Sequence, residues 1–306
     1  MISLCQEYYQ VLLAQAFCIG IGCGLLFIPS VAILSTYFTT RIATAMGLAA
    51  SGSSLGGVLY PIIFHRLLPR IGFAWTTRVI GFVILGTLLL PNVLLRVRVL
   101  PVRSRSLLDL RAFTMPAYFL VCVGFFLGFM GIFTPFFYAQ VNALRNHIMA
   151  PELASYLIAI MNASSVLGRI VPNILADRFG PLNVIVPFTL TSSLLCFCFI
   201  AAKASASAIM LMVLYGFFSG TFVSLPPTII VRLSLDDRGK IGTRLGQCFA
   251  VAAVGVLIGS PIGGAILDAH GFTALWIYAG VVLAASSVVL CGARICHKGW
   301  GLATQA

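Results

Sequence analysis

An arginine lies inside an apolar stretch of this sequence, where a charged side chain needs an explanation. Residues 162–180 read NASSVLGRIVPNILADRFG, and Arg169 follows about fifteen apolar or small residues in a chain that is only 8% charged. Burying a guanidinium in hydrocarbon costs about 3 kcal/mol or more. In one interpretation Arg169 snorkels toward the interface or braces a neighbouring loop. In the other it faces a cavity and pairs with an anion, because its planar, always charged fork of donors suits a carboxylate.

Two polar residues precede Arg169 and are candidates for the same site. Ser165 lies four residues earlier, on the same helical face, and Asn162 lies seven residues earlier, two turns away. Either they help Arg169 to hold a ligand, or they make ordinary hydrogen bonds between helices.

Aromatic residues concentrate in residues 113–138, with Pro135 near the outer end of that segment. Transporter helices that are interrupted near a proline often line the central cavity, where aromatic rings suit a bulky, partly apolar solute. On this basis Phe133, Phe137 and Tyr138 are candidate binding residues. The alternative is packing against lipid, with an aromatic belt at the interface.

Other patterns that resemble catalytic or cofactor motifs lack the context these need. Residues 52–56 (GSSLG) fit GxSxG and residues 20–24 read GIGCG, but both lie in apolar helical stretches with no preceding strand. The nine cysteines form no CxxC pair, and the four histidines lie at or near the ends of apolar runs. The sequence therefore predicts no enzyme, no cofactor and no metal site.

The elements that must position these residues are membrane-spanning helices. The chain of 306 residues is 60% hydrophobic, with a mean hydropathy of +1.07, and its apolar runs are long enough to cross a hydrocarbon layer of about 30 Å. The runs lack the alternation of a β-barrel. We therefore predict an all-α, polytopic membrane protein. The predicted spans are 11–36, 42–65, 74–95, 114–139, 154–176, 183–202, 207–231, 244–267 and 272–293.

The basic residues predict the orientation of these spans. Thirteen Lys and Arg residues fall in connections on one side and four on the other, which makes the richer side cytoplasmic by the positive-inside rule. The C-terminus is then inside and Met1 outside. The formal net charge of +12 reflects this topology and gives no reason to expect nucleic acid as a partner. The thirteen are Arg41, Arg96, Arg98, Arg103, Arg105, Arg111, Arg178, Arg232, Arg238, Lys240, Arg244, Arg294 and Lys298.

A basic linker divides the chain into two unequal parts. Residues 96–112 are predicted to be a cytoplasmic linker between a partial N-terminal bundle of three spans (1–95) and a six-helix C-terminal bundle with a short cytoplasmic tail (113–306). A weak internal repeat relates the first three spans to the last three. The matching spacings are those of Arg41, Gly47 and Gly56 with Lys240, Gly246 and Gly255. Such repeats are typical of secondary transporters. If the first three spans match the last three, the part before the linker has three spans fewer than the part after it, which predicts a twelve-span protein that lacks its first three spans.

Two motifs resemble a known family. The stretch STYFTTRIATAMGLAASGSSLGG (35–57) resembles the YFxKRRxLAxGxAxAGxxxG signature of the monocarboxylate-porter branch of the major facilitator superfamily, particularly its fungal members. The matching residues are Tyr37, Phe38, Arg41, Ala45, Gly47, Ala49, Gly52 and Gly56, whereas Thr40, Ile42 and Thr44 depart from the signature. GRIVPNILADRFG (168–180) resembles the cytoplasmic-loop motif of the superfamily, with Asp177, Arg178 and Gly180 in place.

The resemblance assigns roles to particular positions. It places Arg169 on the substrate-binding arginine of the monocarboxylate porters and Ser165 where transporters of small acids often carry an aspartate that helps to couple protons. The pattern Gly255-x3-Gly259-Ser-Pro261 is similar to one of antiporter-type members, though in a different span, and implies a hinge.

The expected function is secondary active transport of an organic anion or small metabolite by alternating access, inclining toward efflux of a fungal secondary metabolite. The alternatives are proton-coupled monocarboxylate uptake and a truncated membrane protein that does not transport. The expected partners are a small-molecule solute, with a proton as the candidate coupling ion, and the lipid bilayer. The expected location is the plasma membrane.

Overall fold

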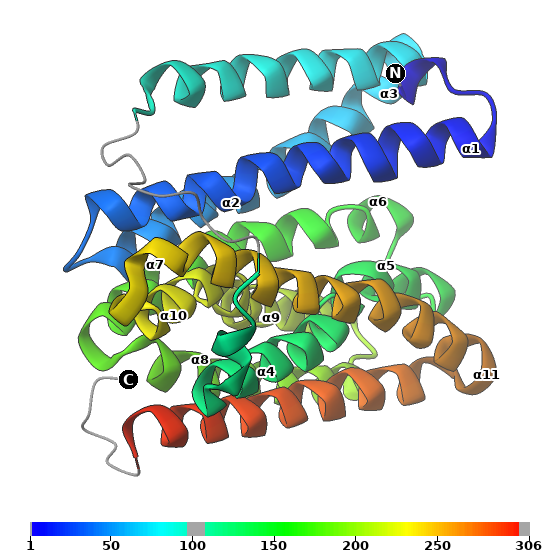
Figure 1. Ribbon diagram of the computed structural model, residues 1–306. Coiled ribbons are helices and arrows are strands. Elements are labelled where there is room, and N and C mark those ends of the chain that lie inside the picture. The colour runs from blue at the N-terminus through cyan, green and yellow to red at the C-terminus, as the bar shows by residue number, and fades with distance from the viewer. Residues whose placement is uncertain (1, 97–107, 300–306) are drawn as a thin grey trace.

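The protein is a bundle of long helices. The computed structural model describes residues 2–96 and 108–299, in which every regular element is helical (Figure 1). The long elements are α2 (Ile19–Tyr37), α3 (Ile42–Leu94), α4 (Pro116–Ile132), α5 (Thr134–Arg145), α7 (Leu157–Phe179), α8 (Pro181–Cys198), α9 (Ser205–Ser224) and α11 (Ile241–Lys298). The short ones are η1 (Ile2–Leu4), α1 (Tyr8–Val11), η2 (Leu12–Cys18), η3 (Leu110–Thr114), α6 (Pro151–Ala154), η4 (Phe199–Ala201), α10 (Pro226–Leu233) and η5 (Leu235–Lys240).

Two of the helices are helical hairpins. Helix α3 has 53 residues and α11 has 58, so each, if straight, would be more than twice as long as the hydrocarbon layer is thick. Instead, each helix reverses its direction at a glycine with positive φ: Gly72 (φ 72°) in α3 and Gly271 (φ 77°) in α11. Residues other than glycine rarely adopt this conformation. The seven continuous apolar helices of the described residues thus supply nine segments, and each predicted span coincides with one of them. The polytopic all-helical prediction is confirmed.

Most of the buried core lies in the bundle formed by α4 to α11. The large side chains Trp276, Tyr118, Tyr215, Phe125 and Phe222 are almost fully buried there. Glycines bring α11 close to α4. A Cβ at Gly255 or Gly259 would overlap the carbonyl of Phe126 or Met130, respectively, so neither position has room for a side chain. The hinge expected around Pro261 stays a prediction.

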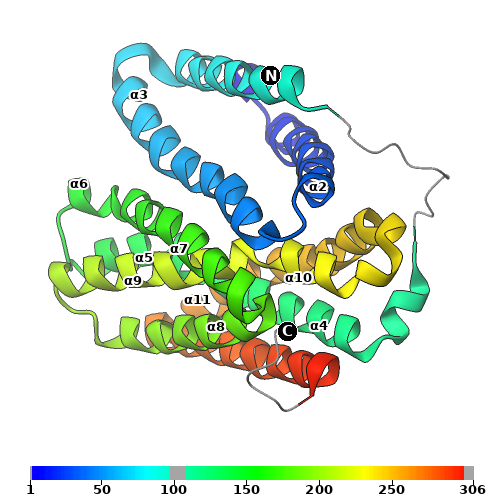
Figure 2. The same ribbon diagram turned by 90° about the vertical axis from the view of Figure 1, so that its left-hand side faces the viewer.

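The helices of residues 8–94 stand to one side of this bundle, with the beginning of α3 against it (Figure 2). They bury little of their own surface: Ala14 and Val31 are the buried residues of 8–37, and Thr76 is the buried residue of 73–94. The two parts therefore meet mainly through the first half of α3.

The contact between these parts is a long antiparallel seam between α3 and α7. It runs from Ala43 beside Asp177 to His65, whose ring centroid lies 6.2 Å from that of Tyr156. Near its middle a Cβ added at Gly47 would overlap the carbonyl oxygen of Arg169. Close approach of two backbones at a glycine is how helices pack tightly in membranes.

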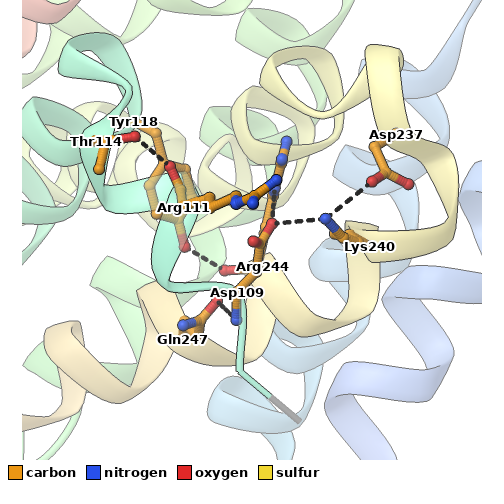
Figure 3. A network of polar contacts seen from close by, with 8 residues as sticks. All are labelled: Asp109, Arg111, Thr114, Tyr118, Asp237, Lys240, Arg244 and Gln247. Carbon is orange, nitrogen blue, oxygen red and sulfur yellow. Dashed lines mark hydrogen bonds and ion pairs between the residues drawn. The ribbon is translucent and has the colours of Figure 1, made fainter. Parts of the chain in front are cut away.

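A buried ion pair between Asp109 and Arg244 links the end of the predicted linker to the start of α11 (Figure 3). The Asp109 carboxylate accepts from Arg244 Nε at 3.1 Å and lies 3.7 Å from Lys240 Nζ. The Asp109 amide donates to Gln247 Oε1 at 3.2 Å, and the Tyr118 hydroxyl donates to the Arg244 carbonyl at 2.8 Å. Arg98, Arg103 and Arg105 of the predicted linker lie outside the described residues, and the domain boundaries stay predictions.

Candidate functional site

A cavity of about 490 Å³ lies between the two parts of the molecule. Helices α2, α3, α4, α7 and α11 line it, together with the junction of α9 and α10. Arg169 stands eight residues before Asp177, which lies near the end of α7 that is predicted to be cytoplasmic, and at 1.5 Å per residue its Cα is about 12 Å from Asp177 along the helix axis. The cavity is therefore near the middle of the predicted membrane.

The wall of this cavity is apolar except for one cation and a few hydroxyls. Its polar side chains are those of Arg169, Ser30, Ser53 and Ser224. Its aromatic residues are Phe27, Phe129, Phe133 and Phe249. No Asp, Glu or His is among the described residues that line it.

Arg169 is held in place by α3 across the seam. The residue is 6% exposed. Its Nη1 donates to the Ala50 carbonyl at 2.8 Å and to the Ser53 hydroxyl, and its Nε donates to Ser165 Oγ at 3.3 Å. These bonds satisfy three of its five N–H groups with neutral oxygens. They fix the orientation of the guanidinium without neutralising its charge.

The remaining donors of Arg169 have no partner among the described residues. Nη2 makes no hydrogen bond to any of them, and no described carboxylate forms a salt bridge with Arg169. An unpaired charge in an apolar wall is costly, and a bound carboxylate would offset that cost through a charge-assisted hydrogen bond. The arrangement can therefore bind an anion with an apolar body.

Phe133 is the predicted aromatic residue that the structure places in the cavity. Its ring lies 6.1 Å from that of Phe129, centroid to centroid, in a stacked arrangement. Elsewhere in the wall the rings of Phe27 in α2 and Phe249 in α11 meet edge to face at 5.2 Å between centroids. Phe27 and Phe249 were not predicted as site residues, because nothing in their own spans distinguishes them from lipid-facing phenylalanines.

The other predicted aromatics lie elsewhere. Phe137 is 56% exposed and is not among the residues that line the cavity. Tyr138 donates from its hydroxyl to the Ser260 carbonyl at 3.0 Å and so links α5 to α11. The aromatic contribution to the cavity therefore comes from Phe133 and Phe129.

Asn162 and Ser165 belong to the seam rather than to the cavity wall. Asn162 Nδ2 donates to the Ile158 carbonyl at 2.9 Å, and a Cβ at Gly57 would lie 2.7 Å from its side chain. Ser165 Oγ accepts from Ser54 Oγ at 3.3 Å as well as from Arg169. The oxygen of Ser165 thus positions the guanidinium, while Asn162 faces α3.

Asp177 joins the end of α7 to the start of α3, at the end of the seam that is predicted to be cytoplasmic. Its carboxylate accepts from the amides of Ala43 at 2.9 Å and Thr44 at 2.8 Å, and from the Thr44 hydroxyl at 2.6 Å. A carboxylate at a helix N-terminus is stabilised by the unpaired N–H groups and by the helix dipole. Thr44, a departure from the family signature, is thus a direct partner of Asp177.

Other matched residues of the two family-like motifs (35–57 and 168–180) lie beside Asp177 or along α3. Arg41 and Arg178 line a small cavity beside Asp177, and Gly180 forms the turn from α7 into α8. Gly47 packs against α7, whereas nothing approaches within 4 Å of a Cβ built on Gly52, and only Tyr60 of its own helix approaches Gly56. Gly57, which is not one of the matched motif residues, does belong to the seam, because a Cβ built on it would lie 2.7 Å from the Asn162 side chain.

Comparison with known families decides the identity of this fold. A family model described as Major Facilitator Superfamily matches residues 1–242 and 117–295. The chain belongs to the major facilitator superfamily. In this member of the superfamily the cavity lined by Arg169 lies between two helical parts. The Asp177 carboxylate holds the two parts together at the end of the seam that is predicted to be cytoplasmic.

Fungal transporters are similar to this chain over almost its whole length. The MFS-type transporter dbaD of Emericella nidulans is 45% identical over 294 residues, covering 95% of this chain and 66% of the relative. The aspyridones efflux protein apdF of the same organism is 40% identical over 297 residues, covering 96% of this chain and 60% of the relative. The agnestins efflux protein AgnL12 of Paecilomyces divaricatus is 34% identical. The chain thus spans less than two thirds of the length of the first two.

Proposed function

We propose that this protein is a secondary active transporter that exports an organic anion by alternating access. The observation that carries the proposal is Arg169, a guanidinium oriented by Ala50 and Ser53, unpaired with any carboxylate of the described residues, and part of the wall of a largely apolar cavity. Binding energy for the anion comes from the remaining donors of Arg169. Binding energy for the body of the solute comes from burial against the cavity wall.

The cavity favours a solute with one negative group and a bulky apolar body. A volume of about 490 Å³ with four phenylalanines in its wall is larger than a short carboxylic acid needs, and falls within the range of about 300–1,000 Å³ of sites for drug-sized ligands. The printed names of two relatives are aspyridones efflux protein and agnestins efflux protein. We infer that the solute is a fungal secondary metabolite that is acidic at cytoplasmic pH.

Export is favoured over proton-coupled uptake of a small acid. Uptake of that kind uses a titratable carboxylate close to the bound anion, and Ser165 stands at the position where the family often has one. Among the described residues the buried carboxylate is Asp109, which is paired with Arg244 away from the cavity.

Alternating access needs contacts that break when the cavity opens to the cytoplasm. The bonds of Asp177 to the start of α3 lie between the two parts at their cytoplasmic end, and rocking of the parts must separate them. The extended α3–α7 seam lets the parts rotate without losing all contact.

We also propose that the chain belongs to the monocarboxylate-porter branch and works in the plasma membrane. The expectation of twelve spans is tested by the coding sequence upstream of Met1.

Metabolite profiling of the producing organism tests the transport itself. Deleting the gene should raise the intracellular level of one or a few acidic metabolites and lower their level in the medium, and re-expression of the chain should reverse both changes. A matched strain re-expressing the Asp237→Asn variant controls for expression, since the Asp237 side chain is 43% exposed and does not line the cavity. Unchanged partition of every acidic metabolite between cells and medium would refute export.

The second candidate function is that of a membrane protein that does not transport. The observation that favours it is the small buried surface of residues 8–37, where Ala14 and Val31 are the buried residues. In that case re-expression of the chain would leave metabolite partition as it is in the deletion strain, while the protein accumulates in the membrane.

A further inference from the structure

A second cavity lies within the C-terminal bundle, at the end of the helices opposite to Asp177. It measures about 390 Å³ and lies between α5, η4 and the second half of α11. Leu157 and Arg169 are twelve residues apart on α7, so this end of the bundle lies about 18 Å from Arg169 along the helix axes. By the predicted orientation this cavity opens to the outer face of the membrane.

The floor of this cavity is aromatic. Phe199 and Trp276 stack at 4.9 Å between ring centroids, with an interplanar angle of 23°, and they are 3% and 1% exposed. Phe272 joins them in the wall. Rings that are packed this tightly are rigid, so the groups they carry have fixed positions.

Hydrogen-bond donors without protein partners line the same cavity. Asn142 is only 6% exposed, and its Oδ1 accepts from Asn146 Nδ2 at 2.5 Å. Its own Nδ2 makes no hydrogen bond to any described residue, and neither does the indole N–H of Trp276. Neither atom is among the buried, unpaired polar atoms of the described residues, so both keep some accessible surface and can donate to a water molecule or a ligand.

Lys203 supplies a positive charge at the edge of the cavity. It is exposed, lines the cavity, and takes part in none of the salt bridges of the described residues. Among the described residues that line the cavity there is no Asp or Glu. Its described lining thus combines a cation, an amide donor and an indole donor, without a negatively charged group.

We propose that this cavity is a second anion site, which binds a carboxylate or phosphate group between Lys203, Asn142 and Trp276. The ammonium of Lys203 provides the charge, and the two neutral donors orient the oxygens. The aromatic floor accommodates an apolar group attached to the anion. Two sources can supply such a group: a free organic acid at the outer face, and the phosphate of an anionic lipid headgroup.

Tryptophan fluorescence of the purified full chain can detect binding, because Trp276 forms the floor of the site. The probe is benzoate, and benzamide is its uncharged analogue. The signal is the part of the fluorescence change that the Trp276→Phe variant does not show. Benzoate should give a saturable change, and benzamide should bind at least tenfold more weakly. Lys203→Gln should weaken benzoate binding about tenfold or more, as expected for the loss of a charged hydrogen bond, and Lys203→Arg should restore most of it.

Arg145→Gln is the matched control, since Arg145 is an exposed cation close in sequence to Asn146 but does not line the cavity. It should change the affinity for benzoate by less than twofold. Nanodiscs of phosphatidylcholine with and without phosphatidylglycerol identify the source. Competition by phosphatidylglycerol that disappears in Lys203→Gln assigns the site to a lipid phosphate, and absence of competition assigns it to a free acid. No saturable signal with benzoate in either membrane, or equal weakening by Lys203→Gln and Arg145→Gln, would overturn the proposal.

Discussion

Substituting alanine for Gly47 tests whether the α3–α7 seam is as tight as the structure shows. A Cβ at this position would overlap the carbonyl oxygen of Arg169 and would lie 2.7 Å from Asn173 Cβ. One of these neighbours is backbone, so it cannot turn away as a flexible side chain would. Gly52 offers a matched control five residues later in the same helix, because nothing lies within 4 Å of a Cβ built there.

The two substitutions share one contribution to the free energy of unfolding and differ in another. Replacing glycine by alanine inside a helix stabilises it by about 1 kcal/mol at either site. Overpacking at a tight contact costs about 1–3 kcal/mol, and it applies only to Gly47→Ala. The difference between the variants therefore isolates the overlap, and we expect Gly52→Ala to be more stable than Gly47→Ala by about 1–3 kcal/mol.

Thermal unfolding of the two variants in the same detergent measures this difference. Gly52→Ala should unfold at or above the temperature of the unsubstituted protein, and Gly47→Ala should unfold several degrees below Gly52→Ala. Equal stability of the two variants would show that α3 and α7 do not approach as closely as described, and would remove the anchoring of Arg169 by α3.

Further substitutions test the two carboxylate contacts by the same unfolding assay. Asp177→Asn should destabilise the protein by about 1–3 kcal/mol, because charged hydrogen bonds to the start of α3 are weakened, and Thr44→Val should cost about 1 kcal/mol; a neutral effect of both would refute the contact. Asp109→Asn should cost about 3–5 kcal/mol, since it leaves Arg244 buried and unpaired. Asp237→Asn removes an ion pair whose side chains are 43% and 38% exposed and should cost about 1 kcal/mol at most; similar costs for the two would contradict the burial of Asp109.

Hydropathy was sufficient to predict the helices and their approximate ends. A span of about 20 apolar residues has few alternatives to a helix in a membrane, and the two hairpins were separated correctly because their turns interrupt the apolar pattern. The internal spacing of glycines was less informative. Gly47 and Gly246 share a repeat position, yet Gly47 packs against α7 and nothing approaches Gly246, because a glycine's role depends on the neighbouring helix.

The partners of the candidate site residues were beyond the reach of sequence reasoning. Arg169 stands out as a charge in an apolar span, but its anchors on α3 are a hydroxyl and a backbone carbonyl more than a hundred residues earlier. A carbonyl has no sequence signal at all. The unusual serines of 51–54 were the one available indication that α3 has a polar face.

The basic residues near the start of α11 illustrate a different limit. Lys240 and Arg244 were counted as markers of the cytoplasmic side, and Lys240 also as a repeat position, whereas both lie beside Asp109. A charge count predicts the side of the membrane but cannot separate solvated residues from buried, paired ones. Asp109 is the single acidic residue of the basic linker, and that isolation was the signal that could have identified it.

The most direct test of the central claim is export by Arg169 variants at matched abundance in the membrane. In the deletion strain, re-expression of Arg169→Gln or Arg169→Lys should leave the same acidic metabolites inside the cells as the deletion does, because neither side chain reproduces the fork held by Ala50 and Ser53. Ser30→Ala, a change of another polar residue in the cavity wall, should restore export. Normal export of these acids by both Arg169 variants would contradict the assignment of Arg169 as the anion-binding residue.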